Sequence, residues 1–173
     1  LSTAVTVALD GSVAGTGDAA GDVMVAIENI VGSGSGSDFL IGDGSANRLD
    51  GLGGNDTLDG GGGADVLAGG AGNDLYIVSD SGDVVVEQAN AGIDTVLTSV
   101  SHVLGTNVEK LAVQGGVVGG LWLVGNGMNN GITGGAGGDT LDGGLGAGTM
   151  TGGAGNDVYI VQQSGDRVVE AAG

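Results

Sequence analysis

A nine-residue repeat runs without a gap from residue 33 to residue 77. Its clearest part is residues 51–77, where three tandem units follow the pattern G-G-x-G-x-D-x-U-x, with U a large apolar residue. The five sixth positions hold Asp38, Asn47, Asp56, Asp65 and Asp74, and the five eighth positions hold Leu40, Leu49, Leu58, Leu67 and Tyr76. A fixed short period predicts a stack of similar structural units in place of a conventional globular core.

A second run of the same repeat occupies residues 125–160. Its sixth positions hold Asn130, Asp139, Gly148 and Asp157. The two runs belong to a longer duplication, because Asp74-Leu-Tyr-Ile-Val recurs as Asp157-Val-Tyr-Ile-Val and Glu87 recurs as Glu170, each 83 residues later (157 − 74 and 170 − 87). A continuous right-handed solenoid therefore explains the chain better than two separate domains do.

The composition excludes several classes of function. Glycine makes up 42 of 173 residues, and its periodic placement favours a repeat fold over disorder. The chain has 3 basic and 21 acidic residues, a net charge of −18, so nucleic acids and anionic membranes should repel it, whereas multivalent cations should be attracted. With no cysteine it has neither a disulfide framework nor a cysteine–zinc site, and no apolar run reaches the length of a membrane span.

The rest of the chain is expected to form short strands. Segments rich in valine and leucine predict strands at residues 3–9, 23–31, 84–87, 95–103 and 108–113, and no segment sustains a helical period. We expect N-terminal strands in 1–32, a first repeat run with its following strand in 33–91, a looser β segment in 92–124, and a second, truncated run in 125–173.

The repeat suits calcium coordination. We expect six residues of a unit to form a turn and three to form a strand, so that two units, about 18 residues, return the chain to stack about 4.8 Å further along. Glycine admits positive φ angles and lets carbonyls converge, and an Asp adds a carboxylate to each turn. Ca²⁺ takes 6–8 oxygens of these two kinds, whereas Mg²⁺ demands a smaller and stricter octahedron.

These motifs resemble the RTX, or hemolysin-type, calcium-binding repeats of bacterial proteins exported by type I secretion, such as serralysin-like proteases, lipases and mannuronan epimerases. The resemblance implies an all-β, right-handed parallel β-roll (a β-solenoid) with several Ca²⁺ ions between stacked Gly-rich turns. It also implies that each ion is held by positions 2, 4 and 6 of one unit and positions 1, 3 and 6 of the second unit after it.

Carried onto this sequence, the resemblance implies five ligand groups. They are Gly34, Gly36 and Asp38 with Gly51, Gly53 and Asp56; Asp43, Ser45 and Asn47 with Gly60, Gly62 and Asp65; Leu52, Gly54 and Asp56 with Gly69, Ala71 and Asp74; Gly61, Gly63 and Asp65 with Val78, Asp80 and Asp83; and Gly135, Gly137 and Asp139 with Gly152, Ala154 and Asp157. The neutral Asn47 and Asn130 should weaken their sites, and Gly148 contributes no side chain.

The resemblance further implies a secreted, extracellular module that folds when it binds calcium and that exports or stabilises a covalently linked neighbouring domain, without catalysis of its own. The lone His102, with no cysteine, makes a catalytic dyad improbable. Two other functions stay open at this stage. One is a polysaccharide-binding module of a mannuronan epimerase-like enzyme, acting through Trp122 or bridging calcium. The other is a stalk repeat of an adhesin or surface-layer protein.

Overall fold

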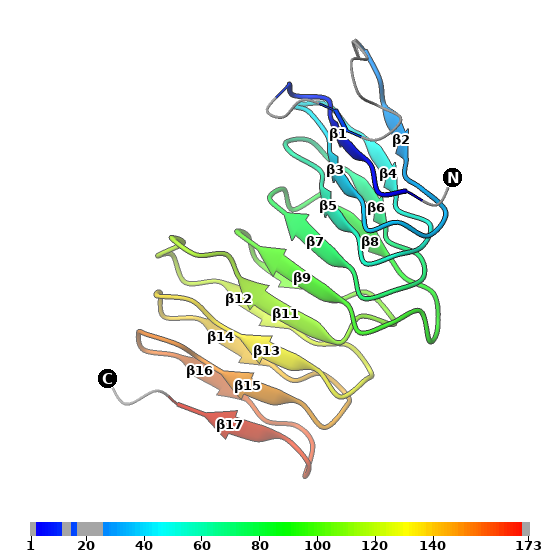
Figure 1. Ribbon diagram of the computed structural model, residues 1–173. Coiled ribbons are helices and arrows are strands. Elements are labelled where there is room, and N and C mark those ends of the chain that lie inside the picture. Colours follow the sequence, from blue (N-terminus) through cyan, green and yellow to red (C-terminus); the bar gives the residue numbers. More distant parts are fainter. Residues whose placement is uncertain (1–2, 12–14, 17–25, 171–173) are drawn as a thin grey trace. The chain divides into compact units, whose positions relative to one another are not determined.

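The computed structural model describes residues 3–11, 15–16 and 26–170. Within these residues every regular element is a β-strand. The described part of the chain therefore contains no helix that is long and apolar enough to cross a membrane. The chain divides into two compact units, Leu1–Asp94 and Thr95–Gly173. Figure 1 shows short strands joined by turns in each unit.

The first unit contains two parallel sheets, and successive strands of the chain belong alternately to one sheet and the other. One has the order β1 (Thr6–Ala8), β3 (Phe39–Ile41), β5 (Thr57–Asp59) and β7 (Leu75–Val78). The other has the order β2 (Asn29–Val31), β4 (Arg48–Asp50), β6 (Val66–Ala68) and β8 (Val84–Val86). Each nonapeptide ends in one of these strands, and from β3 and β4 onward partners lie 18 residues apart, as in Phe39 with Thr57 and Arg48 with Val66.

The second unit repeats this plan. One sheet has the order β9 (Thr95–Thr98), β11 (Lys110–Val113), β13 (Gly131–Thr133), β15 (Thr149–Thr151) and β17 (Arg167–Val169). The other has the order β10 (His102–Val103), β12 (Trp122–Val124), β14 (Thr140–Asp142) and β16 (Val158–Ile160). The 18-residue register holds from β12 and β13 onward, whereas Thr95 pairs with Lys110 and Lys110 with Gly131, at separations of 15 and 21.

The eighth residue of each nonapeptide fills the core. Leu40, Leu58 and Tyr76 are neighbours across β3, β5 and β7, and all are fully buried. Leu141 and Met150 are equally buried in the second unit, but Tyr159 is only half-buried. The strands are three or four residues long for the most part, so the centre of each presents its side chain inward and its flanking residues face outward. The core is therefore a column of single apolar side chains.

The predicted all-β parallel β-roll is confirmed, although several strands are shorter than predicted, such as β1 (Thr6–Ala8, predicted as 3–9) and β11 (Lys110–Val113, predicted as 108–113), and one is divided. Residues 95–103 form two strands on different sheets instead of one, because the hydroxyl of Thr98 donates to the carbonyl of Val100 (2.8 Å) and accepts from its amide (3.1 Å), which turns the chain. Residues 23–25 of the strand predicted at 23–31 lie outside the described residues, and β2 covers Asn29–Val31. The four-part division of the chain stays a prediction.

Candidate metal centre

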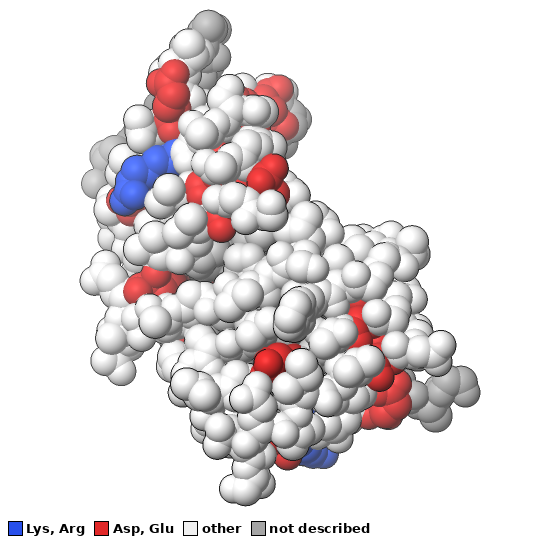
Figure 2. All heavy atoms as spheres, turned by 180° about the vertical axis from the view of Figure 1, so that it is seen from behind, with Lys and Arg blue, Asp and Glu red and all other residues white. Residues whose placement is uncertain are grey.

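Most sixth-position side chains are buried, although carboxylates normally lie at the surface, and Asp157 is half-buried. Asp56, Asp65 and Asp74 are at most 2 % exposed. Asp139 is 1 % exposed in the second unit, and the asparagines at the sixth position, Asn47 and Asn130, are also buried. Figure 2 shows one face of the molecule, on which acidic atoms form small separate groups in a largely uncharged surface. Burying an unpaired carboxylate is costly, so each of these groups needs a compensating partner.

One oxygen of each carboxylate has its partner in the preceding coil. The Oδ1 atom of Asp56 accepts a hydrogen bond from the backbone N–H of Asp38 (2.8 Å), and the Oδ1 of Asp74 accepts one from the N–H of Asp56 (2.7 Å). The Oδ1 of Asp65 and the Oδ1 of Asp157 accept in the same way from residues 18 positions earlier. The carboxylates therefore form ladders along the stack, with one rung in every coil.

The second oxygen divides the carboxylates into two groups. In Asp56, Asp65, Asp74 and Asp157 the Oδ2 atom is buried and has no hydrogen-bond partner among the described residues. In Asp38, Asp83 and Asp139 the Oδ2 atom accepts from a backbone N–H, that of Ser33, Ser79 and Gly135 respectively. A buried, unsatisfied anionic oxygen destabilises a fold unless a cation compensates it, so the first group marks where a metal ion fits best.

Glycine at the first position leaves room for that oxygen. A side chain at Gly51, Gly60 or Gly69 would collide with the Oδ2 atom of the Asp five residues later. At the fourth position, Gly72 has a φ of 134° and any side chain there would run into the carbonyl oxygen of Gly54. The first glycine thus admits the carboxylate, and the fourth allows carbonyls to stack close together.

The structure places some members of each predicted ligand group against one another. The carbonyl of Asp43 accepts from the amide of Gly62 (2.8 Å), that of Leu52 from Ala71 (2.9 Å), and that of Gly135 from Ala154 (2.9 Å). The carbonyl of Gly34 lies beside Gly53, and the amide of Asp65 donates to the Oδ1 of Asp83 (3.1 Å). The carbonyl of Gly61 accepts from the hydroxyl of Ser79, which is not one of the predicted ligands. Because a carbonyl oxygen has two lone pairs, these hydrogen bonds leave capacity for a metal ion.

Departures from the repeat have local consequences. The amide of Asn130 is satisfied at both ends, because its oxygen accepts from Asn126 (2.8 Å) and its nitrogen donates to the carbonyl of Val108 (2.8 Å). Asn47 makes the equivalent pair of contacts with Asp43 and Ile27. These two turns therefore have no anionic oxygen at the sixth position, and that their sites are weaker stays a prediction. Leu52 adopts a left-handed φ of 70° at a second position where Gly61 and Gly70 stand in neighbouring units.

Burial and like charge act together on the carboxyl groups. Burial raises the pKa of Asp56 to about 6, and the negative charges of Asp74 and Asp38 add to the rise. Burial also raises the pKa of Asp65 and of Asp74. Each of these shifts shows that the ionised form is disfavoured in the protein alone, so a bound cation would be favoured at the same place.

Two acidic residues outside the nonapeptides join this system, and they were not predicted as ligands. Asp74, Glu87 and Asp94 are all buried and each offers an oxygen within 4.8 Å of the others. The recurrence of Glu87 as Glu170 was the sequence feature that could have identified Glu87 as part of the site. No such feature marked Asp94, because it lies 20 residues after Asp74 instead of 18 and the Gly-rich motif does not precede it.

Comparison with known families agrees with this geometry. The model of the RTX calcium-binding nonapeptide repeat (four copies) matches residues 32–67, 41–76 and 124–159. No curated protein and no solved structure matches the chain. The matched residues include the sixth-position ladders of both units, where the buried carboxylates lie. The two runs of nonapeptides, within residues 32–76 and 124–159, are therefore RTX calcium-binding nonapeptide repeats.

Proposed function

We propose that this chain binds several Ca²⁺ ions between its Gly-rich turns and folds as it binds them. The observation that carries the proposal is the set of buried Oδ2 atoms without hydrogen-bond partners on Asp56, Asp65, Asp74 and Asp157. Carboxylate and carbonyl oxygens are the donor atoms that Ca²⁺ prefers, and the stacked turns present both. The ligand groups are those predicted from the repeat, and the aspartates with an unsatisfied oxygen should bind most tightly.

The ion-free chain should be poorly folded. Its three basic residues cannot neutralise 21 acidic ones, and several of those acids are buried in the folded form. Bound Ca²⁺ would neutralise the carboxylates and link the carbonyls of successive coils. Because a site made from two coils does not exist in the unfolded chain, the free energy of binding contributes directly to folding.

The cellular role that we propose is that of a secretion and stability module in a larger extracellular bacterial protein, with no catalytic step of its own. Family membership supports this role, since RTX repeats occur in secreted proteins. The coupling of folding to calcium would keep the chain unfolded in a calcium-poor compartment and would fold it in a calcium-rich one.

A calcium titration followed by circular dichroism and calorimetry tests the proposal. We expect little regular β-structure in chelator, a cooperative gain of β-signal with Ca²⁺, and a much weaker response to Mg²⁺ at equal concentration. Calorimetry should give a stoichiometry of several ions per chain. Full β-structure in chelator, unchanged when Ca²⁺ is added, would contradict the proposal.

A further inference from the structure

The segment after β8 closes the last Gly-rich turn of the first unit with a different sequence. Residues 88–94 lack the nonapeptide motif, yet three contacts hold the end of this segment against residues 72–74. The amide of Gly72 donates to the carbonyl of Ala91 (2.8 Å), and that of Ile93 donates to the side-chain oxygen of Asn73 (2.7 Å). The amide of Asp74 donates to the Oδ1 of Asp94 (2.8 Å). Asp94 thus occupies the place that a sixth-position Asp would take in a further repeat.

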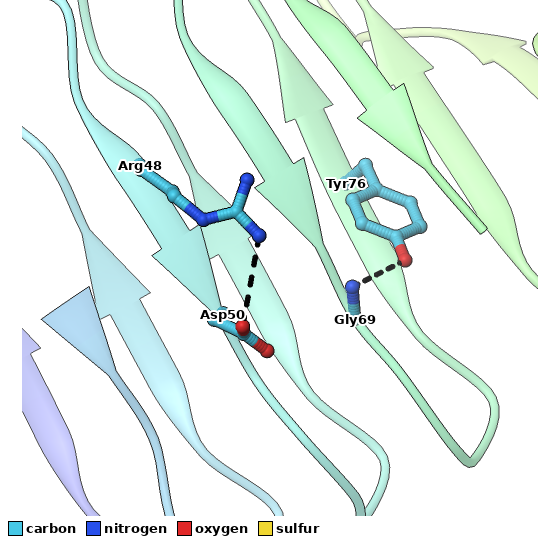
Figure 3. A network of polar contacts seen from close by, with 4 residues as sticks. All are labelled: Arg48, Asp50, Gly69 and Tyr76. Carbon is cyan, nitrogen blue, oxygen red and sulfur yellow. Dashed lines mark hydrogen bonds and ion pairs between the residues drawn. The ribbon is translucent and has the colours of Figure 1, made fainter. Parts of the chain in front are cut away.

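Glu87 reaches the same place from the end of β8. Its Oε1 accepts a hydrogen bond from the hydroxyl of Tyr76, whose oxygen in turn accepts from the amide of Gly69 (2.8 Å). Figure 3 shows Tyr76 with its hydroxyl group beside the nitrogen of Gly69. The backbone of Gln88 donates to the other oxygen of Glu87 (3.0 Å). The carboxylate is therefore held on both oxygens and is only 8 % exposed.

The unsatisfied oxygen of Asp74 lies beside the hydroxyl of Tyr76, the group that contacts Glu87. A side chain at Gly69 would meet both the Oδ2 of Asp74 and the hydroxyl of Tyr76, so the two oxygens converge beside that glycine. Asp74 is 2 % exposed and its Oδ2 has no hydrogen-bond partner in the described part of the chain. Three carboxylates thus meet in a buried space, and the charges of Asp94 and Asp74 both oppose ionisation of Glu87.

We propose that Asp74, Glu87 and Asp94 together bind a divalent cation, at a site made of side-chain carboxylates. The nonapeptide sites, in contrast, depend mainly on carbonyls of the Gly-rich turns. Each carboxylate offers one oxygen within 4.8 Å of the others, and such hard oxygens suit Ca²⁺, which takes 6–8 oxygen ligands in flexible geometry, better than Mg²⁺, which demands a strict octahedron. The site shares Asp74 with the predicted nonapeptide ligands, but Glu87 and Asp94 lie outside the repeats, so it goes beyond the function proposed above.

The second unit repeats part of this arrangement. The hydroxyl of Tyr159 donates to Glu170, the Oδ2 of Asp157 is buried without a partner, and a side chain at Gly152 would meet both Asp157 and Tyr159. Glu170 is exposed, however, and only two carboxylates of the three are present in residues 95–170. Glu170 is therefore a matched control, because it has the same tyrosine contact without the buried set of three acids.

The test is calcium stoichiometry by calorimetry on the full 173-residue chain. Glu87→Gln and Asp94→Asn should each bind one ion fewer than the unmodified chain, whereas Glu170→Gln should bind the same number. Asp56→Asn separates this proposal from the general one, because it weakens a nonapeptide site and leaves Glu87 and Asp94 intact. Unchanged stoichiometry in both Glu87→Gln and Asp94→Asn would overturn the site even if the repeats bind calcium.

Terbium luminescence gives a second readout that does not require the carboxylate variants to fold. Tb³⁺ replaces Ca²⁺ at oxygen sites, and its emission is sensitised by a tyrosine a few ångströms away. We expect Tyr76→Phe to lose most of the tyrosine-sensitised emission while keeping the calcium stoichiometry, since all three carboxylates remain. Emission that is unaffected by Tyr76→Phe would also overturn the proposal.

Discussion

Each buried carboxylate in this chain is distinguished by what its second oxygen contacts. In Asp38 and Asp139 both oxygens accept hydrogen bonds from the protein, whereas in Asp56 and Asp74 one oxygen is left for a ligand. These residues occupy identical positions in the repeat. The sixth-position pattern alone therefore does not rank the sites, and the contacts of the second oxygen do.

Replacing Asp56 with Asn should have opposite effects with and without calcium. In chelator the variant should be as stable as the unmodified chain or more so, because it removes a buried negative charge. With calcium its folding midpoint should move to about tenfold higher concentration, roughly 1.4 kcal/mol. Circular dichroism at a series of calcium concentrations measures both.

Asp59→Asn is the matched control for that change. Asp59 stands at the ninth position of the same unit, and its Oδ1 accepts from the amide of Gly61 (3.1 Å), which an asparagine oxygen can also do. Its calcium midpoint should stay within about twofold of the unmodified chain. Equal shifts in the two variants would show that general charge, and not the position of Asp56, determines affinity.

Residue types and spacing predict which turns stack, because the repeat has the period of the backbone. The structure places Leu52 and Gly54 against Ala71, and Asp56 against Asp74. Their role as calcium ligands stays a prediction. Glu87 and Asp94 could not be assigned in this way, since their approach depends on a tyrosine hydroxyl and on a loop two residues longer than the repeat. The repeat period predicts contacts between nonapeptides, but it does not predict contacts made by the residues that follow the last nonapeptide.

At the scale of the element, a coil is held by one inward side chain and one tight turn. The inward residues were predictable, because strands this short offer a single central position facing the core. Tyr159 stands at the same position of its nonapeptide as Tyr76 does, yet it is only half-buried, while Tyr76 is fully buried. The same motif therefore gives different burial when the coil around it differs.

Truncating Leu58 should destabilise the first unit strongly. Its side chain is fully buried between Leu40 and Tyr76, so Leu58→Ala should lower the free energy of unfolding by ~2–4 kcal/mol in saturating calcium. Leu145→Ala, at a side chain that is 75 % exposed, should change it by less than ~0.5 kcal/mol. Urea denaturation at fixed calcium provides the comparison, and similar losses in both would argue against a core made of single stacked side chains.

The turns impose a separate constraint. Gly72→Ala places a Cβ against the carbonyl of Gly54 at a φ of 134°, and should cost more than about 2 kcal/mol. At Gly44 a Cβ would meet open space, so Gly44→Ala should be nearly neutral. Thermal unfolding in saturating calcium distinguishes them. A neutral Gly72→Ala would mean that the turn can relax, and that stacked carbonyls do not fix its shape.

For the whole molecule, charge is the dominant property. The chain has a net charge of −18, and several of its acidic side chains are buried. Without a bound metal ion, the folded state therefore disfavours the ionised form of these carboxyl groups. Three basic residues provide little internal compensation, and one of them, Arg48, lies 3.7 Å from Asp50 at the surface (Figure 3). Protons and metal ions should therefore act in the same direction on this chain.

Mild acid should partly replace calcium. Folding raises the pKa of Asp56 to about 6 and that of Glu87 to about 7, mainly through burial, so the folded state binds protons more tightly than the unfolded state. Stability in chelator should therefore rise as the pH falls from 7 to 5, and should be lost as the pH rises through these pKa values. The pKa of Asp166 is lowered, so this group contributes to the stability of the folded state, and that contribution is lost only below about pH 4. The β-signal in chelator, measured by circular dichroism at pH 7 and pH 5, tests the sign, and a smaller signal at pH 5 would contradict it.

The alternation of nonapeptides between two sheets limits how such a gene can grow by duplication. In the first unit, Asp38, Asp56 and Asp74 form one ladder, and Asn47, Asp65 and Asp83 form the other. Duplicating 18 residues adds one rung to each ladder and leaves every later residue on its own sheet. Duplicating nine residues would move every later unit to the opposite sheet. A unit from the ladder that contains Asn47 would then stack on a unit from the ladder that contains Asp38. Mutational growth by pairs of repeats is therefore the conservative step, and a single added repeat changes the partner of every unit that follows it.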